Sequence, residues 1–131
     1  MSLMVWDNTL ALGVQTMDGE HKELLALMNK IHDGFLAGAV VNDTVARLGA
    51  ACARHFADEE AFMQSIAYPE LNVHKLLHRQ LLEKYAHHAG AIKAGGGKAN
   101  EAFFSFLKLW LVSHIKGIDA KYAAHSRGAA R

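Results

Sequence analysis

Five histidines and two carboxylates recur at spacings that suit metal binding. His55 and Glu59 are four residues apart, and so are His74 and His78. On an α-helix, residues four apart lie on the same face, so each pair can direct two donor atoms at one point. The candidates come from four separate segments of the chain: His21, His55, Glu59, His74, His78, His114 and Asp119. We interpret them as ligands of two metal ions held between four helices.

The donor types narrow the choice of metal without deciding it. Imidazole and carboxylate together suit iron, zinc or manganese, whereas calcium and magnesium prefer shells made of oxygen alone. Cys52 is the only cysteine, which excludes a site built from several thiolates. We interpret Cys52 as a small buried hydrophobic residue. From the residues alone, iron, zinc and manganese all stay open.

The alternative is that these are ordinary core histidines, which is the better interpretation for any one of them alone. A buried ionisable group is costly unless it is paired, hydrogen-bonded or bound to metal. Seven such groups in register on four helices favour bound cations instead. We expect His87, His88 and His125 to be exposed or at the boundary of the core. His32 is about 16 Å along the helix from His21, too far to share the site.

The apolar residues predict the elements that position these ligands. A chain of 131 residues, 51% of them hydrophobic, suffices for one packed core, so we expect a single domain over 1–131. Apolar residues recur at intervals of three and four in four segments, which predicts an all-α fold. Asn42 or Asp43 and Asn100 are candidate N-caps, and Pro69 can open a helix. We predict an arm over about 1–16 and helices over about 18–37, 43–65, 70–94 and 101–125.

Charge and hydropathy exclude several classes of function. The formal net charge is +1 with acids and bases interspersed, which offers no basic face for nucleic acid. The N-terminus has no basic segment followed by an apolar one, and no stretch of about 18 residues is free of charge. We therefore expect no membrane insertion and a cytoplasmic protein.

The spacing of His114 and Asp119 does not fit a regular helix. Residues five apart are about 140° out of phase on an α-helix, so the two side chains would point in different directions. We predict a π-type widening of the helix between them, because such bulges gather at functional sites. Gly117 would make this distortion easier.

The motifs around the candidate ligands resemble those of the hemerythrin family, and specifically its single-domain bacterial members. Leu81 and Leu77 depart from common family residues without removing a ligand. The resemblance covers essentially the whole chain and implies an up-down-up-down four-helix bundle with an N-terminal extended arm. The matching motifs are Met17-Asp18-Gly19-Glu20-His21, His55-Phe56-x-x-Glu59-Glu60-x-x-Met63, Tyr68-Pro69, His74-Lys75-x-x-His78, and Trp110-Leu111-x-x-His114 with Asp119 and Tyr122.

The resemblance further implies a non-haem di-iron centre that binds dioxygen reversibly. His74, His78 and His114 would bind one iron, and His21 and His55 the other. Glu59 and Asp119 would bridge the two, together with an oxo or hydroxo group, which leaves one open position for dioxygen. Candidates for the lining of the oxygen pocket are Trp6, Leu25, Phe56, Trp110, Leu111 and Ile118.

We expect an oxygen carrier, store or delivery protein that is not an enzyme. The alternatives are an oxygen or redox sensor, or a di-iron enzyme acting as an oxidase or peroxidase or handling nitric oxide or iron. Ferritin-like di-iron enzymes use several glutamates and Glu-x-x-His pairs, whereas the shell here is rich in histidine with two carboxylates. We expect a monomer, with an oxygen-consuming protein as the recipient of the dioxygen.

Overall fold

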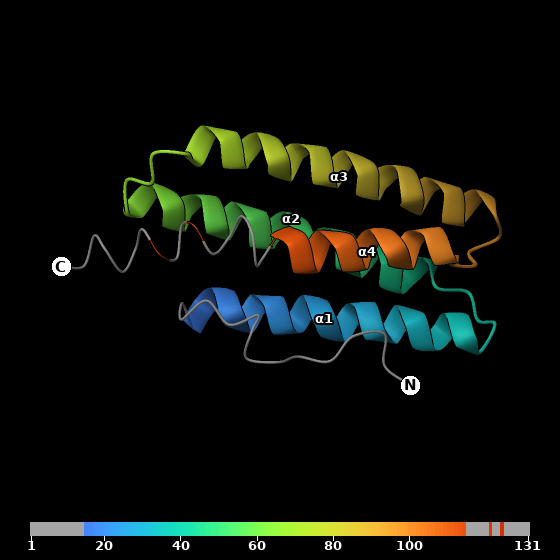
Figure 1. The fold of residues 1–131 in the computed structure, drawn as a ribbon. Coiled ribbons are helices and arrows are strands. Elements are labelled where there is room, and N and C mark those ends of the chain that lie inside the picture. The colour runs from blue at the N-terminus through green and yellow to red at the C-terminus, as the bar shows by residue number, and fades with distance from the viewer. Residues whose placement is uncertain (1–14, 115–120, 122–123, 125–131) are drawn as a thin grey trace.

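The computed structural model describes residues 15–114, 121 and 124, and they form four antiparallel helices (Figure 1). The helices are α1 (Gln15–Leu36), α2 (Asn42–Ser65), α3 (Leu71–Ala94) and α4 (Glu101–Ser113). Short connections join consecutive helices, and α2 packs against both α1 and α3. This arrangement confirms the predicted all-α, up-down-up-down four-helix bundle. Residues 1–14 of the predicted arm and most of the predicted end of the fourth helix lie outside the described residues, whereas residues 15 and 16, predicted as the end of the arm, belong to α1.

One face of each helix forms a continuous apolar core. Residues such as Met28, Leu48 and Phe103 are fully buried and come from α1, α2 and α4. Their spacing of three and four along each helix places them on a single stripe, which is why these segments assemble as a bundle. None of the described helices is both long enough and apolar enough to cross a bilayer.

The helix starts are held in different ways. Asn100 caps α4 as predicted, because its Oδ1 accepts a hydrogen bond of 2.9 Å from the backbone N–H of Phe103. No side chain caps α2; Val41 precedes that helix, is buried and donates its N–H to the carbonyl of Gly97. The prediction of a side-chain cap from Asn42 or Asp43 was therefore wrong, since packing and a backbone hydrogen bond fix this end.

Glycine is required where the α1–α2 and α3–α4 connections meet. Gly97 has a φ of +84°, which L side chains rarely adopt. A Cβ atom added there would lie 2.6 Å from Val40 and 2.7 Å from Asn42. Both backbone conformation and close approach therefore demand glycine at this position.

Two helix starts differ slightly from the predicted ones. α1 begins at Gln15, three residues before the predicted start at 18. Pro69 lies in the turn before α3, which begins at Leu71 with Glu70 at its N-cap position. Neither difference moves a candidate ligand off the buried face of its helix.

Leu48→Ala is expected to destabilise the metal-free protein by about 2–5 kcal/mol, because it removes a fully buried side chain and leaves a cavity. Urea unfolding followed by circular dichroism would measure this difference. Leu76→Ala on α3 is the matched control, since Leu76 is 51% exposed and its loss should change stability by less than about 0.5 kcal/mol. Equal effects of the two changes would contradict the core described above.

Candidate metal centre

Six of the seven predicted ligands meet in the interior of the bundle. They are His21 from α1, His55 and Glu59 from α2, His74 and His78 from α3, and His114 directly after α4. Each of these residues is at most 4% exposed. The seventh, Asp119, lies outside the described residues. Residues distant in sequence therefore supply one buried cluster of nitrogen and oxygen donors.

The donors form two groups that share one carboxylate. In the first group, ligand atoms of Glu59, His74, His78 and His114 all lie within 4.8 Å of one another. His78 Nε2 lies 3.0 Å from Glu59 Oε1, and the Nε2 atoms of His74 and His114 are 3.3 Å apart. This group offers three imidazoles and one carboxylate oxygen.

The second group contains the histidines of α1 and α2. Its ligand atoms, from His21, His55 and Glu59, also lie within 4.8 Å of one another. The other oxygen of Glu59, Oε2, is 3.4 Å from His55 Nε2 and 3.7 Å from His21 Nε2. The two oxygens of Glu59 thus face different groups of histidines, as a bridging carboxylate must.

These separations fit metal coordination. Metal–nitrogen bonds of about 2.1 Å place neighbouring donor atoms roughly 3 Å apart around a six-coordinate ion. The distances of 3.0 Å, 3.3 Å and 3.4 Å lie close to that value. The buried Nε2 of His78 makes no hydrogen bond of regular geometry despite the oxygen 3.0 Å away. The residues present therefore fit a pair of metal ions.

Electrostatics keeps the shared carboxylate charged in the absence of metal. Burial alone would raise the pKa of the Glu59 carboxyl, but the three histidines around it hold that pKa well below 4.5. Burial lowers the pKa of His55, but its hydrogen bond to Glu59 and the charge of that carboxylate outweigh burial, so the net pKa is raised above 6.5. An anionic Glu59 is the form that can bridge two cations.

Two further carboxylates, Glu20 and Glu60, hydrogen-bond to the Nδ1 atoms of His55 and His78. The sequence had not indicated a role for either glutamate. His55 Nδ1–H donates to Glu20 Oε1 over 2.7 Å, and His78 Nδ1–H donates to Glu60 Oε2 over 2.9 Å. A proton fixed on Nδ1 leaves the lone pair on Nε2, which faces the site. The available signal was position, because each glutamate directly adjoins a candidate ligand: Glu20 precedes His21, and Glu60 follows Glu59.

Glu20→Ala and Glu60→Ala are each expected to weaken metal binding by about 10-fold to 100-fold. Each change removes the carboxylate that fixes the tautomer and orientation of one imidazole, that of His55 or His78. Competition with a chelator of known affinity would measure the change. Glu83→Ala, an exposed change on α3, is the control and should leave affinity unaltered. Affinity retained in both of the first two variants would show that these hydrogen bonds do not support the site.

Aromatic side chains enclose the donors on one side. Phe56 stacks on the ring of His78, with centroids 4.0 Å apart and planes 9° apart. Trp110 meets Phe56 edge-on at 5.7 Å, and both are buried. Leu25 is also buried, on the same face of α1 as His21. These three of the predicted pocket residues lie in the core.

The remaining predicted pocket residues are Trp6, Leu111 and Ile118. Trp6 and Ile118 lie outside the described residues, as does the side chain of Leu111. The backbone is π-helical at His114, the last residue of the continuous described segment. The π-type widening between His114 and Asp119 stays a prediction, because residues 115–120 are not described.

His32, His87 and His88 are described and do not join either group of donors, whereas His125 lies outside the described residues. His32 packs edge-on against Phe104 with ring centroids 5.0 Å apart, and His87 is exposed. Burial lowers the pKa of His88, and neighbouring His87 adds to this effect. Cys52 is buried, and burial raises the pKa of its thiol to about 12, so it stays a neutral thiol.

A comparison with family descriptions places this arrangement among known proteins. Residues 12–125 match the family described as the hemerythrin HHE cation binding domain. The chain belongs to the hemerythrin family. The predicted resemblance is therefore confirmed, and the buried histidine and glutamate groups all lie within the matched residues.

Hemerythrins from bacteria and animals resemble the chain over most of its length. A bacteriohemerythrin of Stenotrophomonas maltophilia is 29% identical over 125 residues, which are 94% of this chain and 81% of that protein. A myohemerythrin of Riftia pachyptila is 32% identical over 118 residues, covering 90% of this chain and 89% of that protein. A crystal structure of a hemerythrin mutant superposes with a TM-score of 0.87 at 28% identity, covering 95% of this chain and 98% of the other.

Proposed function

We propose that this hemerythrin domain holds two iron ions and binds dioxygen reversibly as a carrier, store or delivery protein. The observation that carries the proposal is the division of the donors around Glu59, with three imidazoles on one side and two on the other. The bound iron pair, joined by an oxo or hydroxo group, would supply the electrons for reversible dioxygen binding.

The chain's own residues have distinct roles in this proposal. Glu59 and Asp119 would be shared by the two metal ions. His74, His78 and His114 would hold the first ion, and His21 and His55 the second. Because the second position has one imidazole fewer, it is the side on which a small ligand would fit. Glu20 and Glu60 keep the imidazoles oriented through their Nδ1–H groups.

The surroundings of the donors favour reversible binding over enzymatic turnover. Phe56, Trp110 and Leu25 are buried and would exclude water from the site, and exclusion of water limits side reactions. We propose the same role for Trp6, Leu111 and Ile118. A shell rich in histidine also differs from the glutamate-rich shells of ferritin-like enzymes, so we propose a protein that is not an enzyme.

Optical spectroscopy with metal analysis tests the proposal. The purified protein should contain two irons per chain, and the reduced form should gain a charge-transfer band in air that disappears when oxygen is removed. Zinc or manganese in place of iron would overturn the choice of metal. Irreversible bleaching, or turnover of peroxide well beyond that of free iron, would overturn the carrier role.

The proposal extends to the domain organisation, oligomeric state, location and partner of the protein. We propose one domain spanning residues 1–131 that acts as a monomer in the cytoplasm and passes dioxygen to an oxygen-consuming protein. Sedimentation of the iron-loaded protein tests the monomer, which a concentration-independent dimer would overturn.

A further inference from the structure

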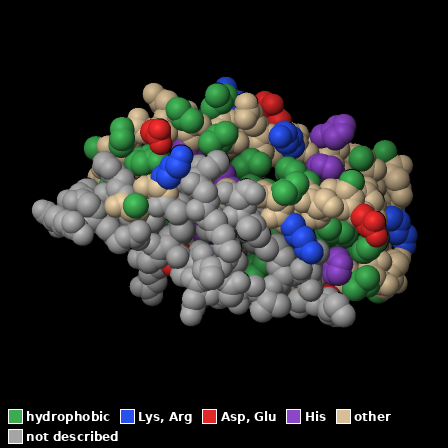
Figure 2. Space-filling model, in the orientation of Figure 1, with side chains coloured by type: hydrophobic (Ala, Val, Ile, Leu, Met, Phe, Trp, Pro, Cys, Tyr) green, Lys and Arg blue, Asp and Glu red, His purple; other side chains and the backbone are tan. Residues whose placement is uncertain are grey.

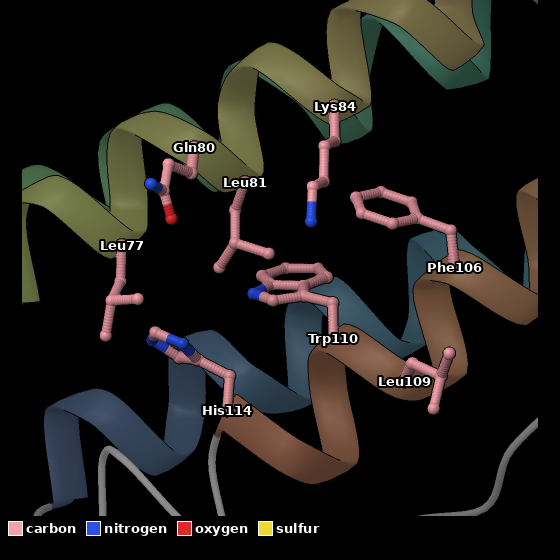
Figure 3. A pocket seen from close by; sticks show the side chains of 8 residues that line it. All are labelled: Leu77, Gln80, Leu81, Lys84, Phe106, Leu109, Trp110 and His114. Carbon is pink, nitrogen blue, oxygen red and sulfur yellow. The ribbon is translucent and has the colours of Figure 1, made fainter.

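A pocket lies between α3 and α4 and borders the buried donor groups at His114. Its volume is about 310 Å³, at the lower end of the range for small-molecule sites. Figure 3 shows the side chains of the two helices facing each other across it. The described lining residues are Leu77, Gln80, Leu81, Lys84, Phe106, Leu109, Trp110 and His114. The pocket is thus largely apolar, with few polar groups.

The polar groups of this pocket are mainly hydrogen-bond donors. The indole of Trp110 is 7% exposed, and its Nε1–H is buried and has no hydrogen-bond partner among the described residues. Such an orphaned donor normally costs free energy, so it calls for an acceptor. In Figure 3 this nitrogen lies at the end of the ring nearest Leu81 and His114, on the pocket side.

A single positive charge accompanies this donor. Lys84 extends from α3 towards the ring of Trp110, and Gln80 adds an amide at the same wall (Figure 3). No acidic side chain is among the described lining residues, and none of the described carboxylates pairs with Lys84. The pocket therefore complements an anion.

The surface around the pocket suits an apolar ligand body. Leu109 in the pocket wall is 68% exposed, and Leu76, one residue before Leu77 on α3, is 51% exposed. Figure 2 shows hydrophobic side chains gathered over α3 and α4, with single basic side chains among them. An alkyl chain lying on these leucines would cover exposed apolar surface.

We propose that the pocket between α3 and α4 binds a small carboxylate with an apolar chain. Its carboxylate would accept hydrogen bonds from Trp110 Nε1–H and the Lys84 ammonium. Its chain would lie against the leucines of the pocket wall. Because His114 also borders the pocket, the ligand would lie beside a proposed iron ligand, yet binding itself needs no metal.

Calorimetric titration with octanoate, octan-1-ol and octylamine tests the proposal, since these share one alkyl chain and differ in head group. Octanoate is expected to bind one-to-one with a dissociation constant below about 1 mM, and more tightly than the other two. Titrating both the metal-free and the iron-loaded protein shows whether octanoate binds independently of the proposed iron pair. Binding to both forms is expected.

Variants of Lys84 and Trp110 separate the head-group contacts from the apolar ones. Lys84→Met and Trp110→Phe should each weaken octanoate binding by about tenfold, while binding of octan-1-ol to Lys84→Met stays unchanged. Lys93→Met, which removes an exposed cation of the same helix outside the pocket, is the matched control and should have no effect. Lys84→Glu, at an exposed position where folding is not at risk, should abolish octanoate binding.

Three results would overturn the proposal. The first is an absence of saturable octanoate binding by the unaltered protein. The second is octylamine binding as tightly as octanoate, which would point to a site for apolar chains alone. The third is unchanged octanoate affinity in both Lys84→Met and Lys84→Glu.

Discussion

Glu59→Gln is expected to reduce the metal content from two ions per chain to one or none, with an affinity loss greater than about 100-fold. One carboxylate oxygen lies 3.0 Å from His78 Nε2 and the other lies 3.4 Å from His55 Nε2, so a single side chain serves both groups of donors. Glutamine keeps the size of the side chain but replaces one oxygen by a donor amide and removes the negative charge. Metal analysis after loading, together with the optical spectrum, would measure the loss.

The control for this change is Glu23→Gln on α1. Glu23 is 51% exposed and pairs with Arg54 on the surface at 3.1 Å, so its loss should leave the metal content unaltered. Circular dichroism would show whether each variant is still helical before loading. A helical Glu59→Gln protein that still holds two ions would contradict the bridging role of Glu59.

Metal-free and metal-loaded protein are expected to respond to pH in opposite directions between about pH 6.5 and 8. In the metal-free protein the pKa of His55 is raised above 6.5, so its stabilising contribution is fully present below that pH and is lost as pH rises through the folded value. A single such group changes stability by at most about 1.4 kcal/mol per pH unit. Metal binding requires deprotonated imidazoles, so the loaded protein should become more stable over the same range.

At acid pH, the stability of the metal-free protein depends on Glu59. Its pKa lies well below 4.5, so its contribution is present above about pH 4.5 and is lost as pH falls through the folded value. Metal-free stability should therefore be greatest between about pH 5 and 6.5. Urea unfolding at several pH values, with and without bound metal, would measure both curves.

His88 requires a control because its titration changes stability in the direction opposite to that of His55. Its pKa is lowered, so it contributes stability above about pH 6.5 that is lost as pH falls. The comparison is best made in a His88→Gln background, which leaves His55 as the main shifted histidine. Slopes of the same sign for the metal-free and metal-loaded forms would contradict the described electrostatics.

Helical periodicity was sufficient to predict both the bundle and the residues that meet in it. The His55 and Glu59 pair and the His74 and His78 pair lie on single helix faces because a spacing of four fixes their direction regardless of the rest of the fold. His21 and His114 belong to the same apolar stripes as the core leucines, so burying those stripes brought them inward. The periodicity within each helix was thus enough to predict that these six side chains would be buried.

Features that depend on contacts between helices were not predictable in this way. The hydrogen bonds of Glu20 to His55 and of Glu60 to His78 each join two helices, and sequence spacing does not fix how two helices face each other. The prediction of a side-chain cap at the start of α2 was wrong for a similar reason, because Val41 is held by a backbone hydrogen bond to Gly97, 56 residues later. Propensity for capping was overridden by tertiary packing at that point.

The spread of donors along the chain also decides when the protein can acquire its metal. The six described donors run from residue 21 to residue 114 of a chain of 131 residues. A ribosome makes the N-terminal helices first, and they carry only an incomplete set of donors until the last helix emerges. The six described donors are therefore all present only after residue 114 has been made.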